Sequence, residues 1–307
     1  EDRARKIQIL EKKQVIDNTS LFKSITTEWM LEAKRENTLR YFYHVDELEQ
    51  IGNGTKYFVI GRGRKGTGKT ALSEYLYNQK SYDTYTERLS FKNFPFNEIY
   101  SLVDPKFTFP NQYITIWKFI IYDAVLRMMS LNESLDTKLL SELIKLYPID
   151  PIDNLSKRVY KLTHNDIKIE LPGIKLSTTT REENPEELNW VRRVNEFEEI
   201  IASKVDKSRY IIIFDALDDD YKTDDDYTVP DGKKQYFALL TGLFKAVQDI
   251  KANLPHTQYK IQPIIFLRDD IYRQIHDSDK SKWDDFTIHL IWNKNKIKKR
   301  LAHRISK

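Results

Sequence analysis

The residues best suited to chemistry lie close together between Lys56 and Thr70, in the stretch KYFVIGRGRKGTGKT. Within it, four residues separate Gly63 from the triplet Gly68-Lys69-Thr70, which is the Walker A spacing. Glycines without Cβ allow the backbone to curl and to turn its N–H groups toward one point. The candidate phosphate-binding residues are therefore Gly63, Arg64, Lys65, Gly66, Thr67, Gly68, Lys69, Thr70 and Ala71.

The flanking segments give this loop the context that such a site needs. An apolar run, Tyr57–Ile60, predicts a strand before it, and Ala71–Leu76 predicts a helix after it. The helix N-terminus would point its positive dipole end at the bound phosphates. Lys69 would add a mobile cation for the β- and γ-phosphates, and the hydroxyl of Thr70 would be offered to Mg²⁺.

A second set of polar residues follows a buried strand. Residues 210–214 read YIIIF, an apolar run typical of a strand buried on both faces, and Asp215 ends it. A carboxylate at this position could hold Mg²⁺ across the sheet crevice, or it could only cap the next element. Asp218 and Asp219 are candidates for positioning the attacking water, and the choice between them stays open. The acidic run Asp218–Asp226 favours a solvated loop over a separate metal site.

Arg268 ends another apolar run, residues 261–267, at a place from which it could sense a γ-phosphate. The alternative is an ion pair with Asp269 or Asp270. Arg273 is a weaker candidate for reaching the nucleotide of a neighbouring subunit.

Composition favours a soluble globular protein. The chain has 307 residues, of which 40% are hydrophobic and 31% charged, and it has no cysteine. No segment runs long enough without charge to span a bilayer, and no secretory signal is recognisable, so we expect a cytoplasmic protein without membrane contact. The missing initiator Met suggests a trimmed product. A net charge of +4 does not by itself argue for nucleic-acid binding.

Strands alternating with helices predict an α/β fold with a parallel sheet. Between Asn93 and Phe109 we expect an irregular linker, and between 166 and 177 a small hairpin. Aromatic residues such as Tyr41 and Phe42 would pack under the first strand, or alternatively touch a nucleotide base. Strands are expected at 57–60, 85–91, 210–214, 261–267 and 287–292.

The domain boundaries that we expect are 1–40 for an N-terminal helical segment, 41–293 for the main domain with a helical insertion at about 110–205, and 294–307 for the start of a lid helix.

Taken together, these motifs resemble the P-loop NTPases with an additional strand, and within them the STAND class and its NACHT-like relatives. The resemblance rests on Gly63–Thr70, on IIIFDALDD at 211–219, on IIFLRDD at 264–270 and on the closing strand and helix at 287–305, and it covers about 40–305. The chain looks closer still to a group of bacterial P-loop ATPases, through FPFNEIYS at 94–101 and SKWDD at 281–285. The resemblance to this family implies a five-stranded, mainly parallel P-loop NTPase core in the order 5-1-4-3-2, with ATP and Mg²⁺ as cofactors.

The resemblance also implies that ATP hydrolysis switches a larger assembly, such as an antiphage-defence system, as a homo-oligomer or with a partner protein. One rival is a nucleotide-binding switch without turnover. Another is a nucleic-acid motor or loader, which the basic tail Lys294–Lys307 would support with seven Lys and Arg and no acidic residue. A small-molecule kinase is a weaker rival, because simple kinases usually lack the extra strand.

Overall fold

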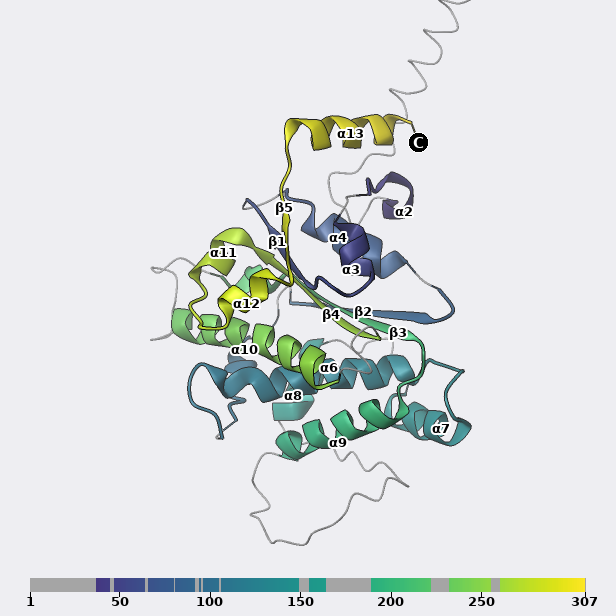
Figure 1. Cartoon of the computed structure of the whole chain (residues 1–307). Coiled ribbons are helices and arrows are strands. Elements are labelled where there is room, and N and C mark those ends of the chain that lie inside the picture. The colour runs from purple at the N-terminus through teal and green to yellow at the C-terminus, as the bar shows by residue number, and fades with distance from the viewer. Residues whose placement is uncertain are drawn as a thin grey trace, which may run out of the picture.

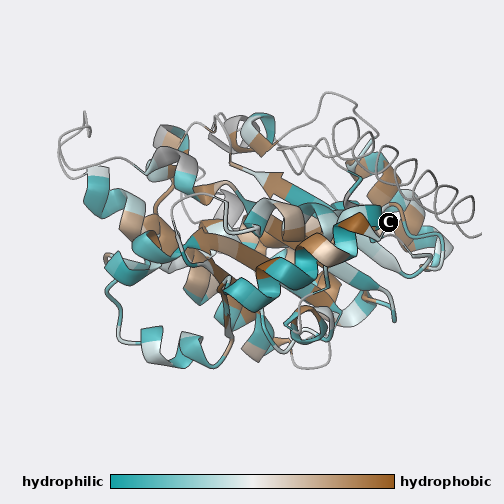
Figure 2. Cartoon of the chain, turned by 90° about the horizontal axis from the view of Figure 1, so that it is seen from above, coloured by the Kyte–Doolittle hydropathy of each residue, from teal (hydrophilic) through white to brown (hydrophobic). Residues whose placement is uncertain are grey.

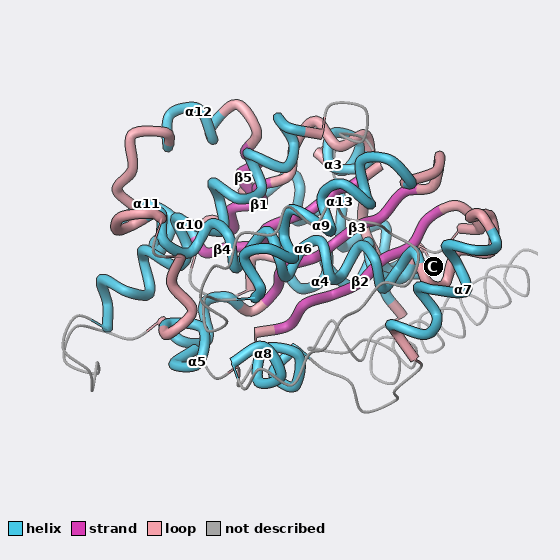
Figure 3. The backbone as a smooth tube through the Cα atoms, turned by 90° about the horizontal axis from the view of Figure 1, so that it is seen from below, coloured by secondary structure: helices cyan, strands magenta, loops and turns pink. Residues whose placement is uncertain are grey.

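The computed structural model describes residues 37–44, 47–63, 66–79, 81–91, 94, 96–104, 106–148, 155–163, 189–221, 232–254 and 260–306. Its centre is a sheet of five strands in the order β2-β3-β4-β1-β5, with every neighbouring pair parallel. Figure 3 shows the strands side by side. This confirms the predicted α/β fold with a five-stranded sheet flanked by helices. The strands are β1 (Phe58–Gly61), β2 (Thr84–Ser90), β3 (Arg209–Asp215), β4 (Ile261–Arg268) and β5 (Thr287–Leu290).

The parallel register brings the carboxyl ends of the strands to one edge of the sheet. Ser90 of β2 pairs with Asp215 of β3, and Gly61 of β1 pairs with Arg268 of β4. The loops that follow β1, β3 and β4 therefore meet at this edge, where ligands bind in open α/β sheets.

Two long helices, α6 (Ile114–Met129) and α10 (Gly232–Asn253), cover one face of the sheet, and a third, α9 (Asn189–Lys204), packs against α6 farther from the sheet (Figure 1). Trp117 of α6 is fully buried, packs against Phe214 of β3, and donates its indole N–H to the carbonyl of Leu239 at 2.8 Å. Each large apolar side chain buried here contributes about 1.5–3 kcal/mol. The helix α6 of the expected insertion is thus part of the main core.

The opposite face carries shorter helices, α2 (Thr38–Tyr41), α3 (Leu48–Gly52) and α4 (Lys69–Asn78). Leu72 and Leu76 of α4 pack on Val59, Ile213 and Phe266 of the sheet. Figure 2 shows brown segments at the centre of the fold. The strands β1, β3 and β4 are buried along almost their whole length, as in a sheet covered on both faces, whereas β2 is mostly half-buried. The core therefore fixes where α4 begins, at the end of β1.

One sequence expectation was wrong. The segment 93–109 was expected to be irregular, but Phe96–Tyr100 forms the short helix α5. Its side chains Phe96 and Ile99 are both buried, and Phe96 lies against Phe91 and Phe94. Burial of two apolar side chains at helical spacing outweighs the irregular pattern that the prolines suggested.

The remaining elements connect these layers. Within the expected helical insertion, α7 begins at Thr137, because the carboxylate of Asp136 accepts hydrogen bonds from the N–H groups of Lys138 and Leu139. The expected hairpin at 166–177 and residues 1–36 lie outside the described residues. The other helices are η2 (Asn111–Tyr113), α7 (Thr137–Leu146), α8 (Leu155–Thr163), η3 (Leu217–Asp220), α11 (Asp269–Gln274), α12 (Lys280–Asp284) and α13 (Lys294–Ile305).

Candidate functional site

The glycine-rich loop joins the end of β1 to the start of α4, as its sequence predicts. Gly63, Gly66 and Gly68 have φ values of 120°, 80° and 86°, a backbone region that residues with a Cβ rarely adopt. These glycines allow the chain to turn tightly before α4 begins at Lys69. Arg64 and Lys65 lie outside the described residues.

Lys69 folds back over the end of β1. A Cβ built at Gly61 would lie 2.9 Å from both Cγ and Cδ of Lys69 and 2.5 Å from Oγ1 of Thr67. The aliphatic stem of Lys69 therefore occupies the space that any side chain at position 61 would need. The sequence analysis did not include Gly61 among the site residues. Its position at the end of the apolar strand, before the loop, was the signal that could have identified it.

Asp215, at the end of β3, lies beside helix α4. Its side chain is buried, with 4% of the residue surface exposed. Oδ1 accepts a hydrogen bond from the N–H of Ala216 at 3.0 Å, and Oδ2 accepts one from the hydroxyl of Ser73 at 3.5 Å. Ser73 follows Thr70 by three residues in α4, so it lies on the same side of the helix about 4.5 Å farther along the axis. The structure thus brings Asp215 to the helix that begins with Lys69 and Thr70.

The backbone turns sharply directly after Asp215. Ala216 has a φ of 60°, the only positive value at a residue other than glycine in the part of the chain that the structure describes. For alanine this conformation costs about 1–2 kcal/mol. The turn directs the chain from β3 into η3, which carries Asp218.

Arg268 and Asp218 form the third part of the site. Arg268 donates hydrogen bonds to both carboxylate oxygens of Asp270, at 3.0 and 2.5 Å, and its Nε lies 3.8 Å from Oδ2 of Asp218. The hydrogen bonds to Asp270 and the charges of both carboxylates raise the pKa of Arg268 above its usual value. The predicted alternative of a pair with Asp270 is therefore confirmed. The side chain of Asp219 lies outside the described residues, and Arg273 pairs with Asp269 at 2.9 Å.

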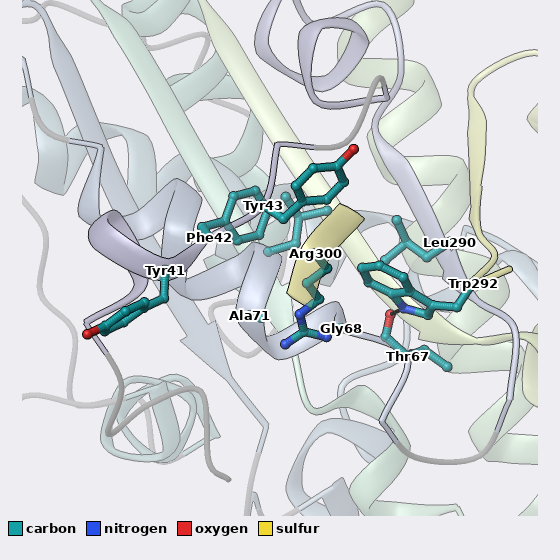
Figure 4. Close-up of a pocket in the computed structure, with 10 residues that line it drawn as sticks. Tyr41, Phe42, Tyr43, Thr67, Gly68, Ala71, Leu290, Trp292 and Arg300 are labelled. Carbon is teal, nitrogen blue, oxygen red and sulfur yellow. Dashed lines mark hydrogen bonds between the residues drawn. The ribbon is translucent and has the colours of Figure 1, made fainter. Parts of the chain in front are cut away.

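An aromatic pocket adjoins the glycine-rich loop (Figure 4). Trp292, just after β5, donates its indole N–H to the carbonyl of Thr67 at 2.8 Å, and its ring lies 3.4 Å from the place of a Cβ at Gly68. The guanidinium of Arg300, from α13, lies 5.3 Å above this ring. The pocket is lined by Tyr41, Phe42, Tyr43, Thr67, Gly68, Ala71, Leu72, Leu290, Trp292 and Arg300.

The pocket is small in the present conformation. Its cavity volume is about 30 Å³, which is enough for water but not for a nucleotide base. Tyr41 is buried, and Phe42 stacks on Tyr75 of α4 at a centroid distance of 4.1 Å, so in this conformation Phe42 packs on that helix. Trp292 and Arg300 were missed by the sequence analysis, because nothing in their local sequence indicates contact with a loop more than 200 residues away.

Helix α13 lies over this pocket and buries none of its own side chains. Lys296 pairs with Glu47 at 2.7 Å, and the guanidinium of Arg304 lies 5.7 Å from the centroid of the Tyr41 ring. Ile297, Leu301 and Ile305 are exposed along one side of the helix. These contacts hold α13 beside the loop through polar and cation–π interactions.

The donor set is suited to Mg²⁺ bound together with phosphates. Among the described residues, no three His, Cys, Asp or Glu side chains gather as a metal cage would require. Mg²⁺ usually keeps several waters and uses one or two protein ligands besides the phosphates of a nucleotide. The hydroxyl of Thr70 and the buried carboxylate of Asp215 fit this requirement.

Comparisons with protein-family models, with curated proteins and with solved structures gave no match for the chain. The described helices include none with both the length and the apolar character of a membrane span.

Proposed function

We propose that this chain binds ATP with Mg²⁺ at the loop Gly63–Thr70 and hydrolyses it. One observation carries the proposal. A glycine-rich loop leads into α4, whose first residue, Lys69, lies over the end of β1, and a buried carboxylate at the end of β3 accepts a hydrogen bond from Ser73 of the same helix. The strand order, read from the other edge as β5-β1-β4-β3-β2, is the order that the resemblance to P-loop NTPases implies and supports the same assignment.

Each residue has a defined role in this proposal. The loop N–H groups and Lys69 bind the phosphates, and the charge they supply stabilises the transferring phosphoryl group. Thr70 and Asp215 hold Mg²⁺, which neutralises phosphate charge when it is bound. Asp218 orients the attacking water, because it lies in the turn after Asp215 and next to Arg268. Arg268, released from Asp270, contacts the γ-phosphate.

The aromatic pocket is the proposed site of the base. It adjoins Gly68 and Ala71 of the phosphate loop, and its rings offer stacking surfaces. Because its present volume is about 30 Å³, a purine enters only when Trp292 and Arg300 move outward. Binding of the base then shifts α13, which gives a nucleotide-controlled switch. The wider role in an antiphage or other regulatory assembly rests on the resemblance alone.

The experiment compares the intact chain with Lys69→Ala and with Lys138→Ala, an exposed lysine on α7. A fluorescent ATP analogue measures affinity, and phosphate release measures turnover. Loss of a charged hydrogen bond of about 1.5–3 kcal/mol predicts binding roughly 10- to 150-fold weaker for Lys69→Ala, with Lys138→Ala unchanged. Equal affinity of all three proteins for the nucleotide would refute the proposed site.

The same measurements separate the rival functions. Tight nucleotide binding with no phosphate release, alone or with partners, would favour a switch without turnover. Hydrolysis that DNA stimulates, with a stimulation that falls steeply with salt, would favour a nucleic-acid motor.

A further inference from the structure

A second, larger groove is lined by residues from the start of α10 and from the end of α11 and just after it. Both helices are labelled in Figure 1. The volume of this groove is about 610 Å³. Unlike the aromatic pocket beside the phosphate loop, it has room for a ligand in the present conformation. It is lined by Phe109, Pro110, Lys233, Lys234, Phe237, Ala238, Thr241, Gln274 and His276.

The lining of this groove is basic. It includes two lysines and a histidine, and none of its nine residues is acidic. The carboxylates of Asp277 and Asp279, which follow His276, lie 3.0 and 3.6 Å from the ammonium group of Lys245. Asp279 also pairs with Lys282 at 2.7 Å, so two cations compensate the two carboxylates. The groove is therefore complementary to an anion.

The groove also presents an aromatic surface. Phe109 is 44% exposed, and the ammonium group of Lys234 lies 4.9 Å from the centroid of its ring. Phe107, two residues earlier, is exposed to the same extent. A cation next to an exposed ring is the combination by which proteins hold a phosphate and stack the attached base.

We infer that this groove binds single-stranded nucleic acid, with Lys234 on the phosphate backbone and Phe109 stacked on a base. A peptide of Asp and Glu alone would satisfy the lysine but has no planar ring for Phe109. A duplex would hide its base faces and leave the ring exposed. This site is separate from the proposed nucleotide site and does not use the loop Gly63–Thr70.

A short chain of contacts joins the groove to the residues proposed to sense the nucleotide. Gln274, which lines the groove, donates hydrogen bonds to the hydroxyl of Tyr221 at 2.9 Å and to the carbonyl of Asp270 at 3.0 Å. The ring of Tyr221 lies 5.7 Å from the guanidinium carbon of Arg268. Gln274 thus lies two contacts away from Arg268.

The test is fluorescence anisotropy of labelled 12-nucleotide dT and rU strands with the full chain, in the absence of ATP. We expect a dissociation constant of about 1–100 μM at low salt for at least one strand. The logarithm of the association constant should fall with the logarithm of the salt concentration with a slope near −1.4 (the salt slope), as about two neutralised phosphates predict. Phe109→Ala should weaken binding roughly 5- to 100-fold. Lys234→Glu should weaken it and make the salt slope shallower by about 0.7.

A matched control separates the groove from the basic helix α13. Lys298→Glu changes the net charge by the same amount on that exposed helix and should leave strand binding unchanged. Phe109→Leu keeps apolar bulk without a ring and should behave like Phe109→Ala, and thermal melting checks that each variant is folded. A preference for dT or rU would identify which nucleic acid is bound.

Three outcomes would overturn the inference. The first is no binding of either strand at low salt. The second is loss of binding in Lys298→Glu but not in Lys234→Glu. The third is equal affinity for polyglutamate, which would make the groove a general anion site. Lys69→Ala should retain strand binding. A result that refutes strand binding in the groove is therefore distinguishable from one that refutes ATP binding at the glycine-rich loop.

Discussion

The substitution Gly61→Ala tests the geometry of the nucleotide site most directly. A Cβ at this position would lie 2.5 Å from Oγ1 of Thr67 and 2.9 Å from two carbons of the Lys69 side chain. Contacts this short force the neighbouring atoms to move, and the flexible stem of Lys69 moves most easily. Because Gly61 has no positive φ in this structure, backbone strain does not confuse the result.

The expected effects on stability and on binding differ in size. Overpacking costs about 1–3 kcal/mol, and the lower entropy of the unfolded chain returns about 0.4–1 kcal/mol. The net loss of unfolding free energy should therefore be roughly 0–2.6 kcal/mol. Displacement of Lys69 should in addition weaken ATP binding roughly 10- to 150-fold, the value of one charged hydrogen bond.

The assay pairs denaturant unfolding with titration of a fluorescent ATP analogue. Gly52→Ala is the matched control, because nothing lies within 4 Å of a Cβ built at Gly52. We expect this control to bind ATP as the unchanged chain does. If Gly61→Ala also bound ATP with unchanged affinity, Lys69 would not contact the nucleotide in the way proposed.

Three further substitutions test other parts of the structure. Asp218→Asn should leave ATP affinity unchanged and slow phosphate release at least about tenfold; unchanged turnover would exclude it as the residue that positions water. Asp136→Ala removes the N-cap of α7 and should lower the free energy of unfolding by about 1 kcal/mol, measured with urea. Burial lowers the pKa of Lys251 to about 8, so the unfolded chain binds more protons above pH 8 and stability should rise with pH between about 8 and 10.5. Lys251→Met should remove this rise and add up to about 3 kcal/mol near pH 7; identical pH profiles of the two proteins would contradict it.

The sheet was predictable because its strands have strong local signals. The run Ile211–Phe214 is apolar on both faces, and only a strand covered on both sides accommodates such a run. The spacing of the glycines between Gly63 and Gly68 likewise predicted the turn. The turn needs positive φ values at these positions, and glycine is the residue that adopts them readily. Local chemistry was sufficient for these elements.

The contacts that complete the site were not predictable in this way. Ser73 meets Asp215 across 142 residues of sequence, and Trp292 meets Thr67 across 225. Neither pair is indicated by periodicity or by a motif, because each depends on how the layers pack. The burial of α6 within the main core has the same origin, since it follows from Trp117 packing on β3.

The hydrogen bond between Trp292 and Thr67 also ties the segment that leads into α13 to the glycine-rich loop. This helix of 12 residues projects from the end of β5 (Figure 1) and is about 18 Å long. A tilt of about 10° at its first residue would move its last turn by about 3 Å. A small shift of the loop that holds the phosphates would thereby become a larger displacement at the far end, where Leu301 and Ile305 face solvent.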